Sequence, residues 1–207
     1  MAIVGDGDST LGVTVPKRVV KPYRFEAETE RMSLTASQER RLLKLAMARA
    51  PGELKEWHDA NDELRRFYAA PSAAMAAYTL SQHEVARQIA NDALALAPSH
   101  ADDWNYGNAI HFGHTVLGLL ALDEGDVRTA LERLCLSGET PGSPQLNSFG
   151  PSMRLARALL RSAESAAVLA YLQQCRRFWK MGQTWLNIWE SKVARGATPT
   201  FFMQLYR

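Results

Sequence analysis

Apolar residues along most of the chain recur with the spacing of a helix rather than that of a strand. From about residue 35 onward they fall three or four positions apart, as in Leu42, Leu43 and Ala46, which is the period of an amphipathic helix. This region has no alternating β-branched run of useful length and no Asn-Gly or Asp-Gly hairpin turn between such runs. The pattern predicts an all-α protein with helices over residues 36–50, 52–69, 72–81, 84–97, 101–123, 126–137, 152–161, 164–179 and 182–194.

Local signals place several helix ends. Thr35 followed by Gln38 has the form of a capping box, which predicts a helix start at residue 36. Pro51 and Pro71 are expected at helix ends because proline interrupts backbone hydrogen bonding within a helix. Between them, one apolar face is predicted from the helical spacing of Leu54, Trp57, Leu64, Phe67 and Tyr68.

Residues 1–30 differ from the rest of the chain because glycine and proline recur there without helical periodicity. We therefore expect an extended or disordered arm, followed by a single helical domain over residues 31–207. The arm contains a basic cluster formed by Lys17, Arg18, Lys21 and Arg24. Such a cluster could contact a phosphate or an acidic protein, although a solvated tail is the favoured interpretation.

Small residues recur at positions where two helices would cross. Leu117-Gly118 is followed by a tight turn and then by Ala130, and an earlier helix carries Ala86, Ala90 and Ala93 before Pro98. Small side chains there would let neighbouring helices pack closely, with Gly118 and Ala130 at a point of backbone approach. A weaker third unit runs from Leu155 to Leu172.

This pattern resembles the tetratricopeptide repeat (TPR) over roughly residues 70 to 180. The resemblance implies TPR-like stacked antiparallel helix pairs, with the N-terminal and the Trp-rich C-terminal helices as caps. The array is irregular, because Ala86 and Ala130 are further apart than the repeat period of about 34 residues.

The first helix of such a pair lines the concave groove, so its polar and aromatic residues are candidate ligand contacts. We name Trp104, Asn105, Asn108, His111 and His114 on this basis. A metal site of both histidines with Asp102 or Asp103 is the alternative, but no zinc-ligand spacing supports it, and we predict no metal and no cofactor. Two histidines packed against neighbouring helices are the more common arrangement.

The segment from Ser137 to Pro151 is longer than a routine connection between helices. Leu146 and Phe149 are expected to anchor it, which would present Gln145 and Asn147 as binding residues. The alternative is a structural connector without a ligand, and the sequence does not favour either interpretation.

Basic residues near the C-terminus complete the candidate set. Arg154, Arg157 and Arg161 form one basic stripe, and Arg176 precedes Trp185 and Trp189. Arginines among aromatic residues can bind phosphates or bases. A buried Trp185–Trp189 face with solvated or paired arginines is the better supported interpretation; Arg154 and Arg176 remain candidates for meeting an acidic group on a partner.

Composition excludes several classes of function. The net charge of +2 over 207 residues is too small to indicate a nucleic-acid or membrane partner. Two cysteines, with Cys135 expected to be buried, form no disulfide framework. No secretory signal, membrane span, Walker loop or nucleophile elbow is evident. We therefore predict a cytoplasmic, non-enzymatic module that binds a protein or peptide.

The sequence leaves two alternative functions open. One is a small-molecule enzyme or accessory enzyme with a histidine general base in the same cleft. The other is a nucleic-acid or regulatory factor that uses the basic C-terminal helices. Exposed aromatic residues on a capping helix would also allow a homodimer.

Overall fold

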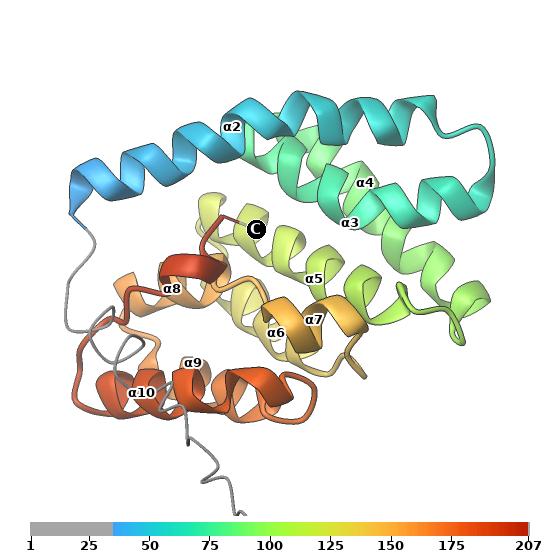
Figure 1. The fold of residues 1–207 in the computed structure, drawn as a ribbon. Coiled ribbons are helices and arrows are strands. Elements are labelled where there is room, and N and C mark those ends of the chain that lie inside the picture. The colour runs from blue at the N-terminus through green and yellow to red at the C-terminus, as the bar shows by residue number, and fades with distance from the viewer. Residues whose placement is uncertain (1–34, 207) are drawn as a thin grey trace, which may run out of the picture.

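The structure is a computed structural model that describes residues 35–206, so the predicted arm of residues 1–30 lies outside the described residues. Over the described range the chain is all-helical and forms no β-strand, as the sequence predicts (Figure 1). The α-helices are α2 (Ala36–Asp59), α3 (Glu63–Thr79), α4 (His83–Leu96), α5 (Tyr106–Asp123), α6 (Val127–Gly138), α7 (Pro144–Phe149), α8 (Arg154–Arg161), α9 (Ser165–Cys175) and α10 (Gln183–Ala194). Short 3₁₀ helices are η1 (Ala97–His100), η2 (Lys180–Gly182) and η3 (Phe202–Gln204).

Helices α2 to α5 each pack against the next helix along the chain (Figure 1). Helix α8 packs on α5 and α6, α9 packs on α6, and α10 packs on α9. The alanine-rich helices explain the close packing in the middle of the molecule. Ala73, Ala77, Ala86, Ala90 and Ala93 are fully buried. Because alanine favours helix and adds little bulk, α3, α4 and α5 can approach one another closely.

Both internal prolines lie within helices, so the prediction that they end helices is wrong. Pro51 lies inside α2 and Pro71 inside α3, and the chain turns instead at Ala60–Asp62, where Asp62 caps α3 through the backbone of Arg65. Pro51 is tolerated because it lies on the exposed face of α2, where the carbonyl that loses its helical partner is open to water.

Pro71 is buried, and its effect on the helix is compensated by a distant side chain. A proline has no N–H, so the carbonyl of Phe67, four residues earlier, lacks its usual helical donor. The side-chain amide of Asn105 donates to that carbonyl at 2.9 Å. A buried carbonyl must find a partner, so Asn105 completes the hydrogen bonding of α3.

The backbone of α5 lies very close to the backbone of the segment after α6, at a glycine that the sequence analysis did not single out. A Cβ atom on Gly107, in the first turn of α5, would lie 1.8 Å from the carbonyl oxygen of Gly142. At Gly118, a Cβ would instead meet the side chains of Leu155 and Arg133. Gly118 therefore makes room for side chains from α8 and α6, and does not mark a backbone crossing with Ala130.

The predicted aromatic face of α10 is confirmed. Trp189 is fully buried between the rings of Trp179, Trp185 and Phe201, at centroid distances of 5.5, 5.8 and 4.9 Å, while Trp185 is partly buried. The chain then returns to α8, where the backbone N–H of Met153 donates to the carbonyl of Gln204 at 2.9 Å. The C-terminal segment is thereby fixed against the body of the protein.

Candidate functional site

The polar residues of α5 face the protein interior, so the expectation that they line an open groove is wrong. The exposed fractions are 1% for Asn105, 6% for Asn108 and 0% for His111. Each of the three side chains hydrogen-bonds groups of this chain. A peptide lying on the surface of the molecule could not reach them.

Asn105 and Asn108 form a buried network that holds the segment after α6. The Asn108 amide donates to Asn105 Oδ1 at 2.9 Å, and the Ser143 hydroxyl donates to Asn108 Oδ1 at 2.6 Å. Gln145, which is exposed, accepts from Asn108 at a longer 3.4 Å. The Thr140 hydroxyl adds a bond to the carbonyl of Gly107 at 2.8 Å. These bonds fix the connector between α6 and α8, residues 138–153, against the first turns of α5.

His111 contacts both the last turn of α6 and the end of the connector that follows it. Its Nε2 accepts the backbone N–H of Ser152 at 2.9 Å, and its Nδ1 lies 3.2 Å from the carbonyl oxygen of Ser137. Because a carbonyl can only accept, Nδ1 carries the proton and the ring is neutral. Burial lowers the pKa of His111 to about 4. Both ring nitrogens are therefore engaged, and neither is available as a general base in this arrangement.

His114 points elsewhere and meets a cation. Its Nδ1 lies 3.1 Å from a guanidinium nitrogen of Arg133, and burial, followed by the charge of Arg133, lowers the pKa of His114 to about 4. Within residues 35–206, no three His, Cys, Asp or Glu side chains are grouped closely enough to hold a metal ion.

The connector from residue 138 to 153 contains α7 and is anchored mainly through Leu146, which is 1% exposed. Phe149 is 54% exposed, so the prediction that it anchors the connector in the core is wrong. Asn147 is half-buried, and its side-chain oxygen accepts the backbone N–H of Lys180 at 3.0 Å. Both predicted amides, Gln145 and Asn147, thus take part in holding the connector.

Other predicted residues have structural partners as well. Arg176 forms an ion pair with Glu190 and hydrogen bonds to Gln183 and Asn187, which agrees with the interpretation of paired arginines. Cys135 is exposed, contrary to the prediction, whereas Cys175 is buried.

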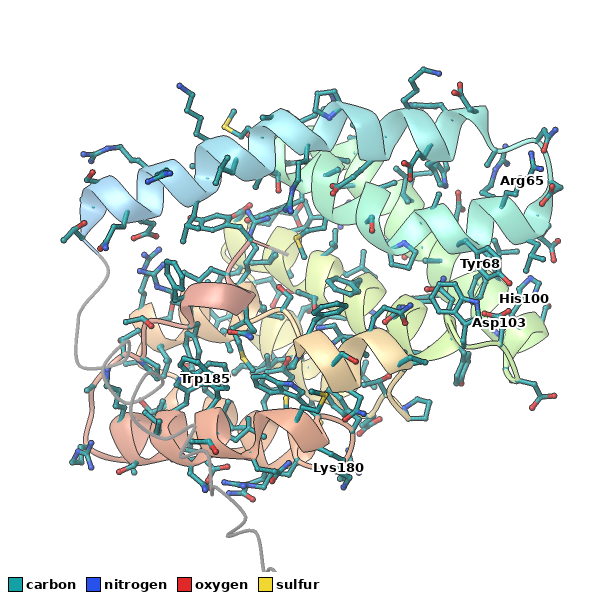
Figure 2. The ribbon with its side chains drawn as sticks, viewed as in Figure 1. Arg65, Tyr68, His100, Asp103, Lys180 and Trp185 are labelled. Atoms are coloured by element: carbon teal, nitrogen blue, oxygen red, sulfur yellow. The ribbon has the colours of Figure 1, made fainter. Side chains whose placement is uncertain are left out.

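Trp104 also remains on the surface, and it belongs to an exposed cluster. We call Leu64, Tyr68 and Trp104 the aromatic surface; they are 42%, 36% and 45% exposed. The rings of Tyr68 and Trp104 lie 5.2 Å apart, and the Tyr68 hydroxyl donates to Asp103 at 2.9 Å. Figure 2 shows Tyr68 and Asp103 together at one end of the molecule.

The sequence pattern predicted Leu64 and Tyr68 on one apolar face with Leu54 because it joined the end of α2 and the start of α3 into a single helix over residues 52–69. Within α3 the two residues are four positions apart and share a face, while Phe67 lies on the buried face. The separate i, i+4 stripe was the signal that could have shown this surface.

Two hollows lie along α3, and one of them has Tyr68 of the aromatic surface in its lining. One, of about 400 Å³, is lined by Glu56, Asp59, Ala60, Arg65, Tyr68 and Ala69. The other, of about 410 Å³, is lined by Asn61, Asp62, Glu63, Arg66, Asp92, Ala95 and Leu96. Acidic side chains outnumber basic ones in both linings. Their volumes fall within the range of about 300–1,000 Å³ that is usual for binding pockets.

Arg154 lies on a different part of the molecule, in a smaller cavity next to α8. It approaches the rings of Tyr78 and Tyr206, with distances from the guanidinium carbon to the ring centroids of 4.9 and 5.3 Å. Aromatic rings from α3 and from the C-terminal segment therefore cover the guanidinium of Arg154.

Comparison with known proteins gave no match: no family model fits the chain, and no similar curated protein or solved structure was found. Among the helices of residues 35–206, none combines the length and the apolar character needed to span a membrane.

Proposed function

We propose that this chain is a non-enzymatic module that binds a protein or peptide partner through the aromatic surface of Leu64, Tyr68 and Trp104. The observation that supports this proposal is the exposure of a large, ordered aromatic pair. Tryptophan and tyrosine are enriched among the residues that dominate binding energy at interfaces. The contact with Asp103 holds Tyr68 in place before a partner arrives, so little side-chain entropy would be lost on binding.

The charges around this surface favour a partner segment that carries a basic side chain next to an apolar one. The two hollows contain five carboxylates, from Glu56, Asp59, Asp62, Glu63 and Asp92, against the two guanidinium groups of Arg65 and Arg66. A lysine or arginine of the partner would be attracted by this excess of carboxylates, and an apolar side chain would cover Trp104.

We also propose that the helix pairs α3–α4 and α5–α6 are TPR-like units. Support comes from the packing of each helix on the next one along the chain and from the full burial of Ala86, Ala90, Ala93 and Ala130. In this proposal the partner binds at the end of the stack where α2 turns into α3, and not on the first-helix face of α5. A cytoplasmic location is part of the same proposal and agrees with free thiols at Cys135 and Cys175.

The enzyme alternative has weaker support. It requires His111 or His114 as a general base in a cleft, but both ring nitrogens of His111 are hydrogen-bonded within the protein. Neither histidine lines the two hollows along α3.

The test is a comparison of partner capture by the unaltered chain, Trp104→Ala and Leu45→Ala. Leu45 is a matched control because it is 56% exposed and lies in the N-terminal half of α2, outside the aromatic surface. Proteins captured from native lysate are identified by mass spectrometry, and each candidate is then titrated as a purified protein. A partner of the proposed kind binds at least about ten-fold more weakly to Trp104→Ala and equally well to Leu45→Ala.

Equal affinity of every partner for both variants would rule out the aromatic surface as the binding site. Binding of a second copy of this chain, seen as a concentration-dependent dimer that Trp104→Ala abolishes, would identify the partner as the protein itself. Trp104→Ala should change the melting temperature by only a few degrees, because the side chain is nearly half exposed.

A further inference from the structure

The cavity beside α8 is lined by a cluster of cations that come from one helix. Its lining consists of Glu39, Tyr78, Leu119, Arg154, Arg157, Ala158, Arg161, Leu205 and Tyr206. Figure 1 shows the C-terminal end of the chain lying between α2 and α8, and the lining includes Leu205 and Tyr206 from this end. The three arginines are three or four positions apart in α8, so they lie on one face of that helix.

The carboxylates near this cavity are already committed. Glu39 accepts two bonds from Arg157, at 2.7 and 3.0 Å, and one longer bond from Arg161 at 3.5 Å. Asp123 lies 4.0 Å from His83, and its charge also acts on Tyr78 and, without an ion pair, on Arg154. Arg49 adds a further positive charge by donating to the carbonyl of Tyr206. The lining alone contains three guanidinium groups and one carboxylate, a net charge of +2.

Arg154 has no carboxylate partner within the described residues, although its guanidinium is largely covered. Its Nη1 donates to the Thr79 hydroxyl at 2.8 Å and contacts the Met75 sulfur at 3.1 Å. Its Nη2 and Nε groups donate to no atom of residues 35–206. A guanidinium has five N–H donors, so three donors in Arg154 are available to something that enters the cavity.

Arg161 provides a second available cation at the mouth of the cavity. Its side chain is 64% exposed, and its one contact within the described part of the chain is the long bond to Glu39. Arg154 and Arg161 both line this cavity, while Arg157, between them on α8, stays paired with Glu39. Two guanidinium groups on the same anion give the charge-assisted, directional hydrogen bonds that suit phosphate recognition.

The charge and size of the cavity indicate the class of ligand. A phosphate monoester carries a charge of about −1.5 to −2 at neutral pH, which matches the net +2 of the lining better than a single carboxylate does. The cavity volume is about 150 Å³. That volume leaves room for a phosphoryl group. The remainder of a larger ligand would lie outside, next to Arg161.

We propose that this cavity binds the phosphoryl group of a small phosphorylated molecule, with Arg154 and Arg161 as its ligands. The site lies away from the aromatic surface and does not depend on the proposed partner binding. Burial by Tyr78, Tyr206 and Leu119 lowers the local dielectric around Arg154, which strengthens its attraction for the phosphoryl oxygens.

The first test is a titration of the full chain with inorganic phosphate at constant ionic strength and pH 7.5. Calorimetry measures the binding, and the melting temperature measures the stabilisation. Saturable stabilisation by phosphate is expected, and chloride at the same ionic strength should not reproduce it. Acetate, with a single charge, should bind at least about ten-fold more weakly than phosphate. Equal responses to phosphate and chloride, or equal affinities for phosphate and acetate, would overturn the proposal.

Variants separate a binding role from a structural one. Arg161→Met changes an exposed side chain, so the protein should fold normally and bind phosphate about ten-fold more weakly. Arg195→Met is the matched control, because this exposed arginine at the end of α10 lies outside the cavity lining. Arg154→Met should abolish phosphate binding, and circular dichroism checks its folding. Unchanged phosphate affinity in Arg161→Met would remove the assignment.

A final comparison identifies the source of the phosphoryl group. Methyl phosphate represents a small phosphorylated molecule, and a short phosphoserine peptide represents a modified protein. Methyl phosphate should bind at least as tightly as the peptide, because the small cavity accommodates the phosphoryl group alone. Much tighter binding of the peptide would overturn the small-molecule assignment.

Discussion

His111 provides the sharpest test of the finding that the polar face of α5 is structural. Replacing it with alanine removes the partners of two backbone groups, the carbonyl of Ser137 and the N–H of Ser152. Each buried group left without a partner costs about 1–3 kcal/mol. We therefore expect His111→Ala to lower the free energy of unfolding by about 4 kcal/mol, with the loss of packing included.

That loss corresponds to a fall in melting temperature of about 8–16 °C for a domain of this size. Thermal and denaturant unfolding, monitored by far-ultraviolet circular dichroism, measure both quantities. His114→Ala is the matched control, because His114 is the same residue type on the same helix but is only partly buried and contacts Arg133. It should change stability by no more than about 1 kcal/mol.

The effect of His111→Ala should also depend on pH in a defined direction. Burial lowers the pKa of His111 to about 4 in the folded protein, against 6.5 for an unperturbed histidine. The unfolded chain therefore binds more protons between these two values, so the unaltered protein loses stability as pH falls from 6.5 toward 4. The variant lacks this group, and the destabilisation measured at pH 7 should shrink by about 2 kcal/mol at pH 5.

Two results would refute this reasoning about His111. A melting temperature within a few degrees of the unaltered protein would mean that the two hydrogen bonds contribute little. A destabilisation that stays constant between pH 7 and pH 5 would mean that the imidazole is not held neutral by burial. Other titrating groups are common to both proteins and largely cancel in the difference between them.

Further predictions concern the backbone of α3 and α5. Asn105→Ala should destabilise the protein by about 1–3 kcal/mol. The same change should cost much less in a Pro71→Ala background, because the alanine N–H can donate to the Phe67 carbonyl. Additive effects of the two substitutions in denaturant unfolding would contradict the role of Asn105 as the replacement donor. Gly107→Ala should cost about 3 kcal/mol or more, because its Cβ would overlap the Gly142 carbonyl. Gly52→Ala, where nothing lies within 4 Å of the added Cβ, should instead raise stability by up to about 1 kcal/mol in the same measurement.

The sequence predicted helix type and several helix ends well, because those features depend on neighbouring residues. The capping box at Thr35 is present, and α4, α6 and α10 begin and end within about two residues of their predicted bounds. Periodicity and caps act over a few positions, so a single sequence shows them.

The sequence could not show where proline would be tolerated. At Pro71 the cost of the missing N–H is offset by Asn105, which is 34 positions away and reaches the Phe67 carbonyl only in the folded state. A local rule places a helix end at Pro71 because it has no information about that contact. The same contact explains why a polar residue occurs where the fold buries it.

The candidate site was misplaced for a related reason. Polar residues on a helix face indicate an exposed face unless another polar segment covers them. Here the connector after α6 supplies Ser143 to Asn108 and the backbone N–H of Ser152 to His111, while the last turn of α6 supplies the carbonyl of Ser137. Nothing local to α5 specifies that pairing. The interpretation of a structural connector, which the sequence had left open, is therefore the one that the hydrogen bonds favour.

Function should then be sought where the structure leaves binding capacity unused. The polar groups of α5 have partners within the chain, so they have little left for a ligand. By contrast, Trp104 keeps nearly half of its surface exposed, and Arg154 keeps donors that no described residue accepts. Water can solvate exposed indole only at a free-energy cost, and a covered guanidinium attracts anions more strongly than a solvated one. Because the two features lie on different parts of the molecule, partner binding and phosphate binding should be separable by single substitutions.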